Sequence, residues 1–490
     1  MRKLPSSVKA LCLACLLLGP TISVAATIEE KIEDLQRQLD ELKVIQQVQQ
    51  DQIEDDNEEE QAGIEIVAHE APAMTDSPEI SFGGQYRVNF YSADNDFANP
   101  AANNQDNQTA SRLRIRQNID TKFGQQLKTH LQFELGHTTD NVTTTDRRRG
   151  GNSTNVSVRH AEIDYTFQTS NLFDGTNARV GLVPLQDFFH QTQFSADWDY
   201  NPLAASFTVP IGESSLRMFA ANLEEGSESN ADDDFLHYQT DVTIPFGGRA
   251  GVVLTGTALN IADAVSDSSS WHYNFGLAAH MKLGSITGSG FVIGSSTDRA
   301  LLGSTRDANG IAALAEINIS LGPGDLGILT SYTTGEDDGT GFLSPMAFAT
   351  TFGYWGYTGI LTVQGPTDTG FDFDGVNISN NGYGMSTVQA RYTFPVTSAL
   401  SGYLAAGWFG NTDAGERDST VGADFLAMGT YRFNKAIALD LGGAFGKLND
   451  SVSGYFQGVQ NPGPGGPAFN QALGEDRTKW ALFGRIQVEL

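Results

Sequence analysis

The hydrophobic pattern divides the chain into two regions with different periods. In residues 27–58, apolar residues recur at alternating spacings of four and three, the heptad pattern of a coiled coil; these positions are Ile28, Ile32, Leu35, Leu39 and Leu42. No Gly or Pro interrupts this segment, and its other faces are mostly Glu, Asp, Gln and Lys. We therefore expect an α-helical coiled coil, dimeric or trimeric. The alternative is an amphipathic helix that folds back on its own domain.

From Glu79 onward the period changes to two, which is the period of a β-strand. In EISFGGQYRVNFY, Ile80 and Phe82 share one face, while Gln85 and Arg87 share the other. Similar alternating segments of about ten residues recur to the C-terminus, at 127–136, 235–246, 271–283, 421–433 and 477–490. Short connections such as GGR and LGS alternate with long polar ones. This arrangement predicts an all-β transmembrane up-and-down barrel over residues 79–490.

Counting the connections predicts 18 antiparallel strands. The count depends on residues 335–382, which we interpret as one long loop although FGYWGYTGILTV within it could be a strand. A count of 16 is the alternative.

A soluble β-sandwich would also show alternating strands, so a second feature is needed to choose between the two folds. Gly and Ala are common on the apolar faces, where a sandwich would need large interdigitating side chains. Aromatic residues also gather at strand ends that lead into short turns, as the girdle of a membrane barrel does; they are Phe123, Tyr165, Phe167, Phe246, Tyr392, Phe394, Tyr431 and Phe433. Both features favour the membrane barrel.

The segment SRLRIRQNIDTKF places three arginines on one face and Leu113 and Ile115 on the other. An arginine facing lipid near the midplane costs about 2–4 kcal/mol, so the arginine face must line a wet lumen. Extending this assignment gives a predicted pore wall of Arg87, Arg112, Arg114, Arg116, Lys122, Lys128 and Arg179. Such a wall either favours anions or forms a structural ladder that pairs Asp120 or Glu134 on neighbouring strands.

The third long loop, residues 184–203, is rich in aromatic side chains that need to be buried, among them Phe188 and Phe189. Folding this loop into the barrel would bury them and narrow the pore. Four of its side chains would then face the arginines across the constriction: Asp187, His190, Asp197 and Asp199. The alternative is burial at a contact between subunits.

The first 26 residues predict a secretory signal peptide, with Arg2, Lys3 and Lys9 before an apolar run and cleavage after Ala25 or Ala26. Both cysteines, Cys12 and Cys15, lie in this segment, so disulfides and thiolate metal sites are excluded from the mature chain. Residues 59–78 contain two prolines and no period, and we expect them to form a linker. The formal charge of the whole chain is −29, and within residues 79–490 the acids are concentrated in loops such as 223–234.

Taken together, the barrel, the girdle and the inward loop resemble Gram-negative outer-membrane porins. The coiled coil ahead of the barrel is similar to that of the phosphate-selective and dicarboxylate-type trimeric porins. The resemblance implies passive diffusion of small hydrophilic solutes, a homotrimer, and an outer-membrane location with the coil in the periplasm. The chain departs from this pattern in two ways. It ends in Leu490, where the assembly signal usually has Phe, and its 18 predicted strands exceed the 16 usual in the phosphate-selective group.

Two other classes of function are considered against the channel. A structural envelope protein would use the coiled coil to tether the outer membrane. An enzyme would need a catalytic constellation, but the histidines are scattered singly, and no nucleophile elbow, HExxH motif or phosphate-binding glycine loop occurs. We therefore expect no enzymatic activity, no cofactor, no metal and no nucleic-acid partner.

Overall fold

The structure is a computed structural model. It describes residues 77–93, 108–138, 155–168, 173–185, 187–190, 192–193, 201–224, 235–263, 268–298, 307–336, 341–345, 356–360, 384–413, 419–449 and 477–490. The predicted signal peptide (1–26), coiled coil (27–58) and most of the linker (59–78) lie outside the described residues, and they remain predictions.

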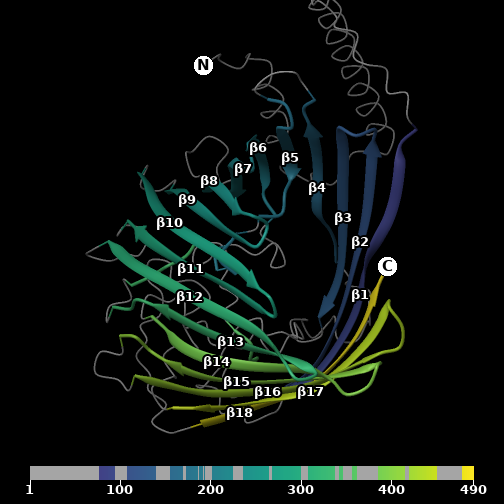
Figure 1. Ribbon diagram of the computed structural model, residues 1–490, viewed down its shortest axis with the longest axis vertical. Coiled ribbons are helices and arrows are strands. Elements are labelled where there is room, and N and C mark those ends of the chain that lie inside the picture. The colour runs from purple at the N-terminus through teal and green to yellow at the C-terminus, as the bar shows by residue number, and fades with distance from the viewer. Residues whose placement is uncertain are drawn as a thin grey trace, which may run out of the picture. The chain divides into compact units, whose positions relative to one another are not determined.

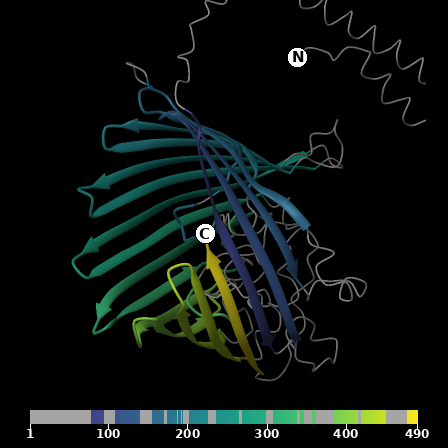
Figure 2. The same ribbon diagram turned by 90° about the vertical axis from the view of Figure 1, so that its right-hand side faces the viewer.

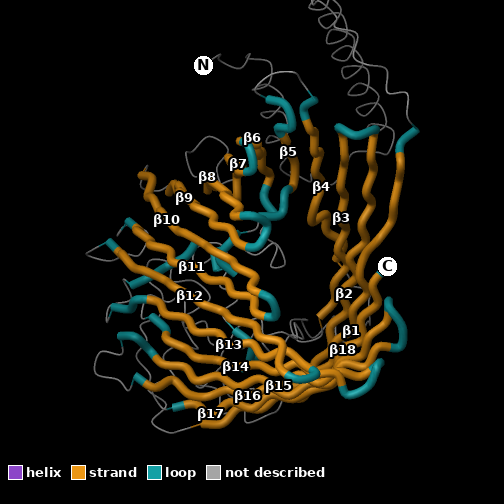
Figure 3. The backbone as a smooth tube through the Cα atoms, in the orientation of Figure 1, coloured by secondary structure: helices purple, strands orange, loops and turns teal. Residues whose placement is uncertain are grey.

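The described residues form one sheet of 18 strands. In chain order these are β1 (Glu79–Ala93), β2 (Gln108–Phe123), β3 (Leu127–Thr138), β4 (Asn155–Thr166), β5 (Asn177–Leu182), β6 (Leu203–Ile211), β7 (Ser214–Glu224), β8 (Phe235–Phe246), β9 (Ala250–Asp263), β10 (Ser268–Leu283), β11 (Ile286–Thr297), β12 (Ala308–Leu321), β13 (Gly324–Thr333), β14 (Ser386–Pro395), β15 (Leu400–Gly410), β16 (Thr420–Arg432), β17 (Ile437–Leu448) and β18 (Arg477–Glu489). No helix long and apolar enough to cross a bilayer occurs among these residues (Figure 3).

The sheet is closed, because every strand pairs antiparallel with its neighbours in sequence and β1 also pairs with β18 (Figure 1). Val88 of β1, for example, lies opposite Leu113 of β2 on one side and Ile486 of β18 on the other. The prediction of an 18-stranded antiparallel barrel is confirmed, and the alternative count of 16 is excluded. The described part of residues 335–382 contains no strand beyond the end of β13.

The outward face of the barrel is apolar along its strands, which run obliquely across Figure 2. Phe82 is 72% exposed, Phe275 70% and Leu482 60%, although all three are large hydrophobic residues in regular strands. Near the short turns, aromatic side chains two residues apart contact each other, with ring centroids 5.0 Å apart for Tyr165–Phe167 and 4.9 Å for Tyr431–Phe433. A closed barrel with this outer surface is suited to hydrocarbon.

The inward face differs between two parts of the wall. On β1–β5, β7 and β8, which we call the polar arc, charged and amide side chains point inward. On β10–β18, which we call the packed arc, large apolar side chains also point inward and are fully buried, among them Phe291, Ile293, Leu329 and Phe409. The expectation that inward positions face water is therefore wrong for the packed arc.

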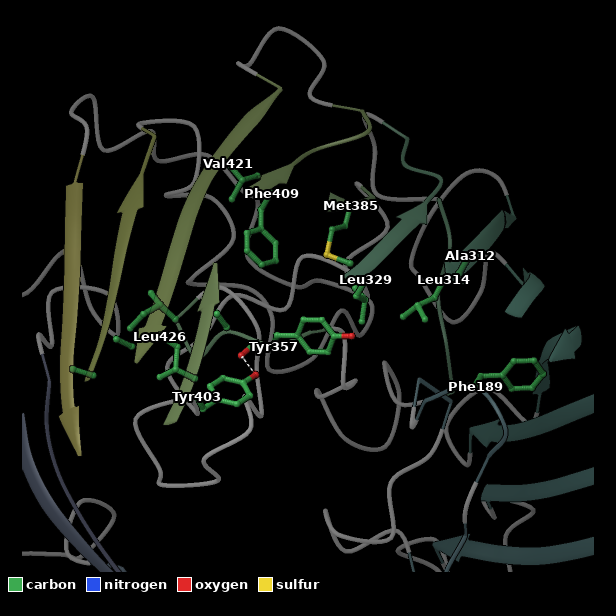
Figure 4. Packing of buried hydrophobic residues seen from close by; sticks show 14 of the residues in the cluster. Phe189, Ala312, Leu314, Leu329, Tyr357, Met385, Tyr403, Phe409, Val421 and Leu426 are labelled. Carbon is green, nitrogen blue, oxygen red and sulfur yellow. Dashed lines mark hydrogen bonds between the residues drawn. The ribbon is translucent and has the colours of Figure 1, made fainter. Parts of the chain in front are cut away.

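The packed arc is buried because two loops turn into the barrel and cover it. These are loop β5–β6 (residues 183–202) and loop β13–β14 (residues 334–385). Phe189 of the first and Tyr357 of the second belong to the same buried cluster as Leu329 and Phe409 of the wall (Figure 4). The apolar residues on the inner face of these strands are thus buried by loop side chains, and those on the outer face are suited to contact lipid.

Inward glycines make room where these loops contact the wall. A Cβ on Gly276 of β10 would lie 2.7 Å from Cζ of Phe189, and one on Gly446 of β17 would lie 2.7 Å from Cγ2 of Ile360. Real Cβ atoms do not approach other atoms so closely, so the residue without a side chain is required at both places. Each glycine therefore marks a docking point of a loop on the wall.

Candidate functional site: the lumen wall and its two loops

The arginines of β1 and β2 turn inward, as the alternation predicts. Arg87 and Arg114 lie directly opposite each other across the two strands. Arg87 Nε donates to Oε1 of Gln487 at 3.0 Å, and Arg114 Nη2 donates to Oε1 of Gln85 at 3.0 Å. They are only 8% and 5% exposed, so they are packed into the wall more closely than freely solvated side chains.

Arg116 and Arg112 complete the sequence-predicted set on β2. Arg116 lies opposite Glu134 of β3 and donates from Nε to Oε2 at 2.6 Å. The structural ladder through Glu134 is thus present alongside the inward row. The backbone of Arg112 lies between Asn89 of β1 and Thr138 of β3, and its side chain lies outside the described part of the structure.

Arg159 of β4 also belongs to this group, although the sequence reasoning missed it. Its Nη1 lies 3.3 Å from Oε2 of Glu134, and the side chain is buried. The register between β3 and β4 shifts at this point, since Gln132 pairs with His160 but Phe133 pairs with Val158. This β-bulge leaves Arg159 as an extra residue. The alternation in VSVRHAEIDY changes phase between Val158 and Ile163, and that signal could have revealed it.

Two further arginines line the wall beside the inward loop. Arg179 of β5 donates to Oδ2 of Asp164, with Nη2 at 2.7 Å. Arg217 of β7, which the sequence reasoning also missed, lies opposite Asp241 of β8 and donates to its Oδ2 from Nε at 2.7 Å. Simple alternation between Leu216 and Met218 could have placed Arg217. A cavity of about 160 Å³ lies between these two arginines and residues 183–185 of loop β5–β6.

Lys122 and Lys128 lie directly opposite each other on β2 and β3. Both are exposed, and they line a recess of about 520 Å³ together with Asp120 and His130. The only ion pair of Lys122 in the described residues is a loose one with Glu79 at 3.9 Å, between two exposed side chains. Lys122 and Lys128 are thus the most exposed of the described side chains in the sequence-predicted pore wall.

The histidines of the polar arc form a short chain rather than isolated wall positions. Nδ1 of His130 lies 2.7 Å from Oδ1 of Asp120, and Nε2 of His130 lies 3.3 Å from Nδ1 of His160. Nε2 of His160 lies 3.0 Å from Oδ1 of Asn201, near the end of loop β5–β6. This chain links the wall to the base of that loop.

Loop β5–β6 contacts both the polar arc and the packed arc. The Arg217 guanidinium lies over the Phe188 ring, 5.4 Å from its centroid. The next residue, Phe189, is completely buried and packs edge-on against Phe291 of β11. Neighbouring aromatic side chains of one loop thus contact β7 and β11, which are four strands apart in the sheet.

The polar residues of this loop that were predicted to face the arginines differ from one another in their surroundings. Both carboxylate oxygens of Asp187 accept backbone N–H groups of the loop itself, from Phe189 and Gln193. His190 lies at the packed arc, with Nε2 3.2 Å from Oγ of Ser289 and Nδ1 3.7 Å from Oε2 of Glu316. Asp197 and Asp199 lie outside the described residues.

Loop β13–β14 covers the other part of the packed arc, and its inward position was not anticipated. The backbone N–H of Tyr357 donates to Oε1 of Gln389 at 2.7 Å, and that of Ile360 donates to Oδ2 of Asp424 at 2.7 Å. The hydroxyl of Tyr403 on β15 donates to the Tyr357 carbonyl at 2.8 Å (Figure 4). The aromatic run FGYWGYTGILTV carried the same signal as loop 184–203, namely side chains that need burial.

Burial shifts the pKa of one titratable group in each loop. It lowers the pKa of His190 below the ordinary histidine range, against the opposing effect of the Glu316 carboxylate, so the imidazole is neutral at pH 7. Burial and the neighbouring Glu316 raise the pKa of the Tyr357 phenol, which therefore remains a protonated donor.

The arrangement provides a charged inner wall with two loops packed against it. Among the described residues, no group of three or more His, Cys, Asp or Glu side chains is placed to hold a metal ion. His237 and His272 are fully buried in the wall beside Gln239 and Asn274. His280 lies on the inward face of β10, opposite Gly251 of β9, and is exposed.

No family model matches the chain, and no curated protein matches it in sequence. Solved structures do. OccAB1 of Acinetobacter baumannii superposes with a TM-score of 0.52 at 10% identity, covering 84% of this chain and 97% of that chain. OpdO of Pseudomonas aeruginosa gives 0.49 at 10% identity, over 84% and 97%. An anion-selective porin from Comamonas acidovorans gives 0.43 at 12% identity, over 84% and 100%. The resemblance to outer-membrane porins therefore extends to the fold of the barrel.

Proposed function

We propose that the chain is an outer-membrane porin through which small hydrophilic solutes diffuse passively, with a mild preference for anions. The observation that carries the proposal is the closed barrel itself, apolar on its outward face and lined on one inner arc by inward-facing bases. A barrel with this division of surfaces has hydrocarbon outside and water inside.

The preference for anions rests on the charge of the polar arc. In β1–β8 the inward-facing bases outnumber the acids among the described side chains; the bases are Arg87, Arg114, Arg116, Lys122, Lys128, Arg159, Arg179 and Arg217, and the acids are Glu79, Asp120, Glu134, Glu162, Asp164 and Asp241. The predicted pore wall, Arg112 included, is proposed to act through this excess.

Like charges placed directly opposite each other are destabilising in a sheet. Residues directly opposite each other have Cβ atoms about 5 Å apart, and two unit charges at that distance repel by about 0.8 kcal/mol even at the dielectric constant of water. Arg87 and Arg114 occupy one such pair of positions, and Lys122 and Lys128 occupy another. Keeping two such pairs on one inner wall costs the fold stability, and a passage for anions is a function that would favour them.

Loop β5–β6 is proposed as the constriction, since its described residues lie inside the barrel against Arg217 of β7 and Phe291 of β11. In this proposal Asp187 holds the shape of the loop and His190 fixes its far end. Asp197 and Asp199 are proposed to face the passage.

We also propose that residues 27–58 form a periplasmic coiled coil and that the chain assembles as a homotrimer after removal of residues 1–26. The heptad pattern and the resemblance to coiled-coil porins support this. The mass of the detergent-solubilised particle, measured with and without residues 27–58, tests it. A monomeric particle in both cases contradicts it.

The channel proposal is tested in planar bilayers by conductance and by the reversal potential in a KCl gradient. The purified chain should conduct, with a reversal potential on the anion-selective side. Changing Lys122 and Lys128 together to glutamine should lower the anion-to-cation permeability ratio. Lys435→Gln makes the same kind of charge change in the exposed turn between β16 and β17 and should leave the ratio unchanged. Absence of conductance, or a reversal potential on the cation-selective side, contradicts the proposal.

A further inference from the structure

One carboxylate contacts both inward loops. Glu316 of β12 accepts a hydrogen bond from the Tyr357 hydroxyl of loop β13–β14, with 2.6 Å between Oη and Oε1. Its other oxygen, Oε2, lies 3.7 Å from Nδ1 of His190 in loop β5–β6. Arg391 of β14 adds Nη2 at 3.5 Å from Oε1. We call Glu316 with His190, Tyr357 and Arg391 the Glu316 junction.

Arg391 holds the junction together from the wall. Its guanidinium lies over the Tyr357 ring, 4.8 Å from the centroid, and Nη2 also donates to Oδ1 of Asn318 at 2.7 Å. Asn318 in turn donates to Oε1 of Glu316 at 3.2 Å. Glu316 is therefore fixed by β12 and β14 while its two oxygens face different loops.

His190 has an unusual backbone conformation that its surroundings must stabilise. His190 has a φ of 53°, the one positive value among the described non-glycine residues. Such a conformation persists only where the surroundings enforce it. The Phe189 ring fills the space left by the missing side chain of Gly276, which we call the Gly276 notch. The His190 side chain contacts Ser289, Phe291 and Glu316.

Neither loop depends on the junction for its main attachment. Loop β5–β6 has the Gly276 notch, and loop β13–β14 has the Tyr357 and Ile360 backbone bonds to Gln389 and Asp424. No hydrogen bond or ion pair between His190 and Tyr357 is present in the described residues. Among the described residues, the Glu316 carboxylate links the two side chains, with one of its oxygens near each.

We propose that Glu316 is a positioning residue that couples the two loops, so that they narrow the lumen as one unit rather than independently. This inference rests on the proposed channel function where it concerns the width of the passage. The coupling itself does not depend on transport. Loss of the Glu316 carboxylate should let each loop leave the packed arc without the other.

The coupling is measured by a double-mutant cycle on His190 and Tyr357. His190→Asn removes the imidazole and keeps a residue type that tolerates positive φ. Tyr357→Phe removes only the hydroxyl. The readout is the rate at which a maleimide modifies Ser344→Cys, a site in loop β13–β14 that is 1% exposed in the chain as it stands. The predicted mature chain has no other cysteine.

With Glu316 present, His190→Asn should speed modification of Ser344→Cys although it lies in the other loop, and its effect should differ by at least about twofold with and without the Tyr357 hydroxyl. In a Glu316→Ala background, His190→Asn should have no further effect on this rate. Asp440→Asn is the matched control, because that inward carboxylate contacts Arg485 and Thr430 of neighbouring strands and should leave the coupling intact. Equal effects of His190→Asn with and without Glu316 would overturn the proposal.

A pH series separates coupling from simple structural support. Because burial lowers the pKa of docked His190, a free imidazole takes up a proton more readily than a docked one, and acidification below the ordinary histidine pKa favours release. The rate of Ser344→Cys modification and the open-channel noise should therefore rise between pH 7 and pH 5, and His190→Asn should remove this rise. In Glu316→Gln the cross-loop rise in modification rate should vanish while the noise persists.

The two proposals fail in different ways. Absence of conductance with intact cross-loop effects on labelling would contradict the channel and leave the junction standing. Normal conductance, together with independent effects of His190→Asn and Tyr357→Phe on the labelling rate, would contradict the junction and leave the channel standing.

Discussion

The polar arc and the packed arc belong to one sheet, yet they satisfy inward side chains by different means. In the polar arc, charges on neighbouring strands compensate each other, as Arg116 and Glu134 do at 2.6 Å. In the packed arc, loops supply apolar cover, as Phe189 does over Gly276. The first arrangement leaves room for water and solutes, and the second removes it. The comparison shows that a barrel lumen can be wide by strand number and still be narrow along one side.

The largest effect is expected from removing the cover of the packed arc. Phe189→Ala deletes a completely buried ring and should lower the free energy of unfolding by about 3–5 kcal/mol. It should also raise the single-channel conductance, because loop β5–β6 loses its anchor. Urea unfolding in micelles and bilayer recording measure the two effects. Phe188→Ala, at a ring that is 40% exposed, is the control and should cost clearly less.

The next effect is expected at the centre of the polar arc. Glu134→Gln removes the carboxylate shared by Arg116 and Arg159, whose side chains are only 12% and 4% exposed. Leaving buried guanidinium groups without their counter-charge should cost about 3 kcal/mol. The anion-to-cation permeability ratio should rise in the same variant.

An exposed ion pair on the same arc provides the contrast. Glu79→Gln removes the partner of Lys122, where the side chains are 76% and 52% exposed. Urea unfolding should show a change within about 1 kcal/mol, since exposed pairs contribute little. Equal losses of unfolding free energy in Glu79→Gln and Glu134→Gln would contradict the distinction between buried and exposed ion pairs of the polar arc.

A further test of the packed arc concerns the contact between Gly276 and the Phe189 ring. Gly276→Ala would place a methyl group 2.7 Å from the Phe189 ring and should cost about 1–3 kcal/mol through overpacking. Gly294→Ala is the matched control on β11, because its Cβ would meet only backbone oxygens at 3.8 Å or more. If both variants unfold at the same urea concentration, the ring does not depend on the notch.

Most of the barrel could be predicted from the sequence, because the period of two is set by the environment on the outward face. Lipid requires an apolar residue at nearly every outward position, so residues such as Phe82 and Leu482 mark strand after strand. The inward face carries no such uniform requirement. Phe291 and Ile293 are as apolar as their outward neighbour Val292, and nothing local shows that a loop covers them.

The candidate site was therefore predicted only in part. Arg87, Arg114 and Arg116 follow from the alternation alone, whereas Arg159 depends on a change of phase within β4. The position of His190 at Ser289 and Glu316 is a contact between residues far apart in the sequence, and alternation has no information on such contacts. The inward position of loop β13–β14 could have been suspected from its aromatic run, but its partners Gln389 and Asp424 could not.

The bulge at Arg159 bears on how such a lumen could change over time. Inserting one residue into a strand normally exchanges its two faces, which would expose polar groups to lipid. In β4 the chain absorbs the extra residue locally, so that Val158 and Ile163 both still face outward while Arg159 and His160 both face inward. A one-residue insertion can thus add a charge to the interior without altering the membrane surface, which lets transport properties diverge while the outer wall remains under unchanged selection.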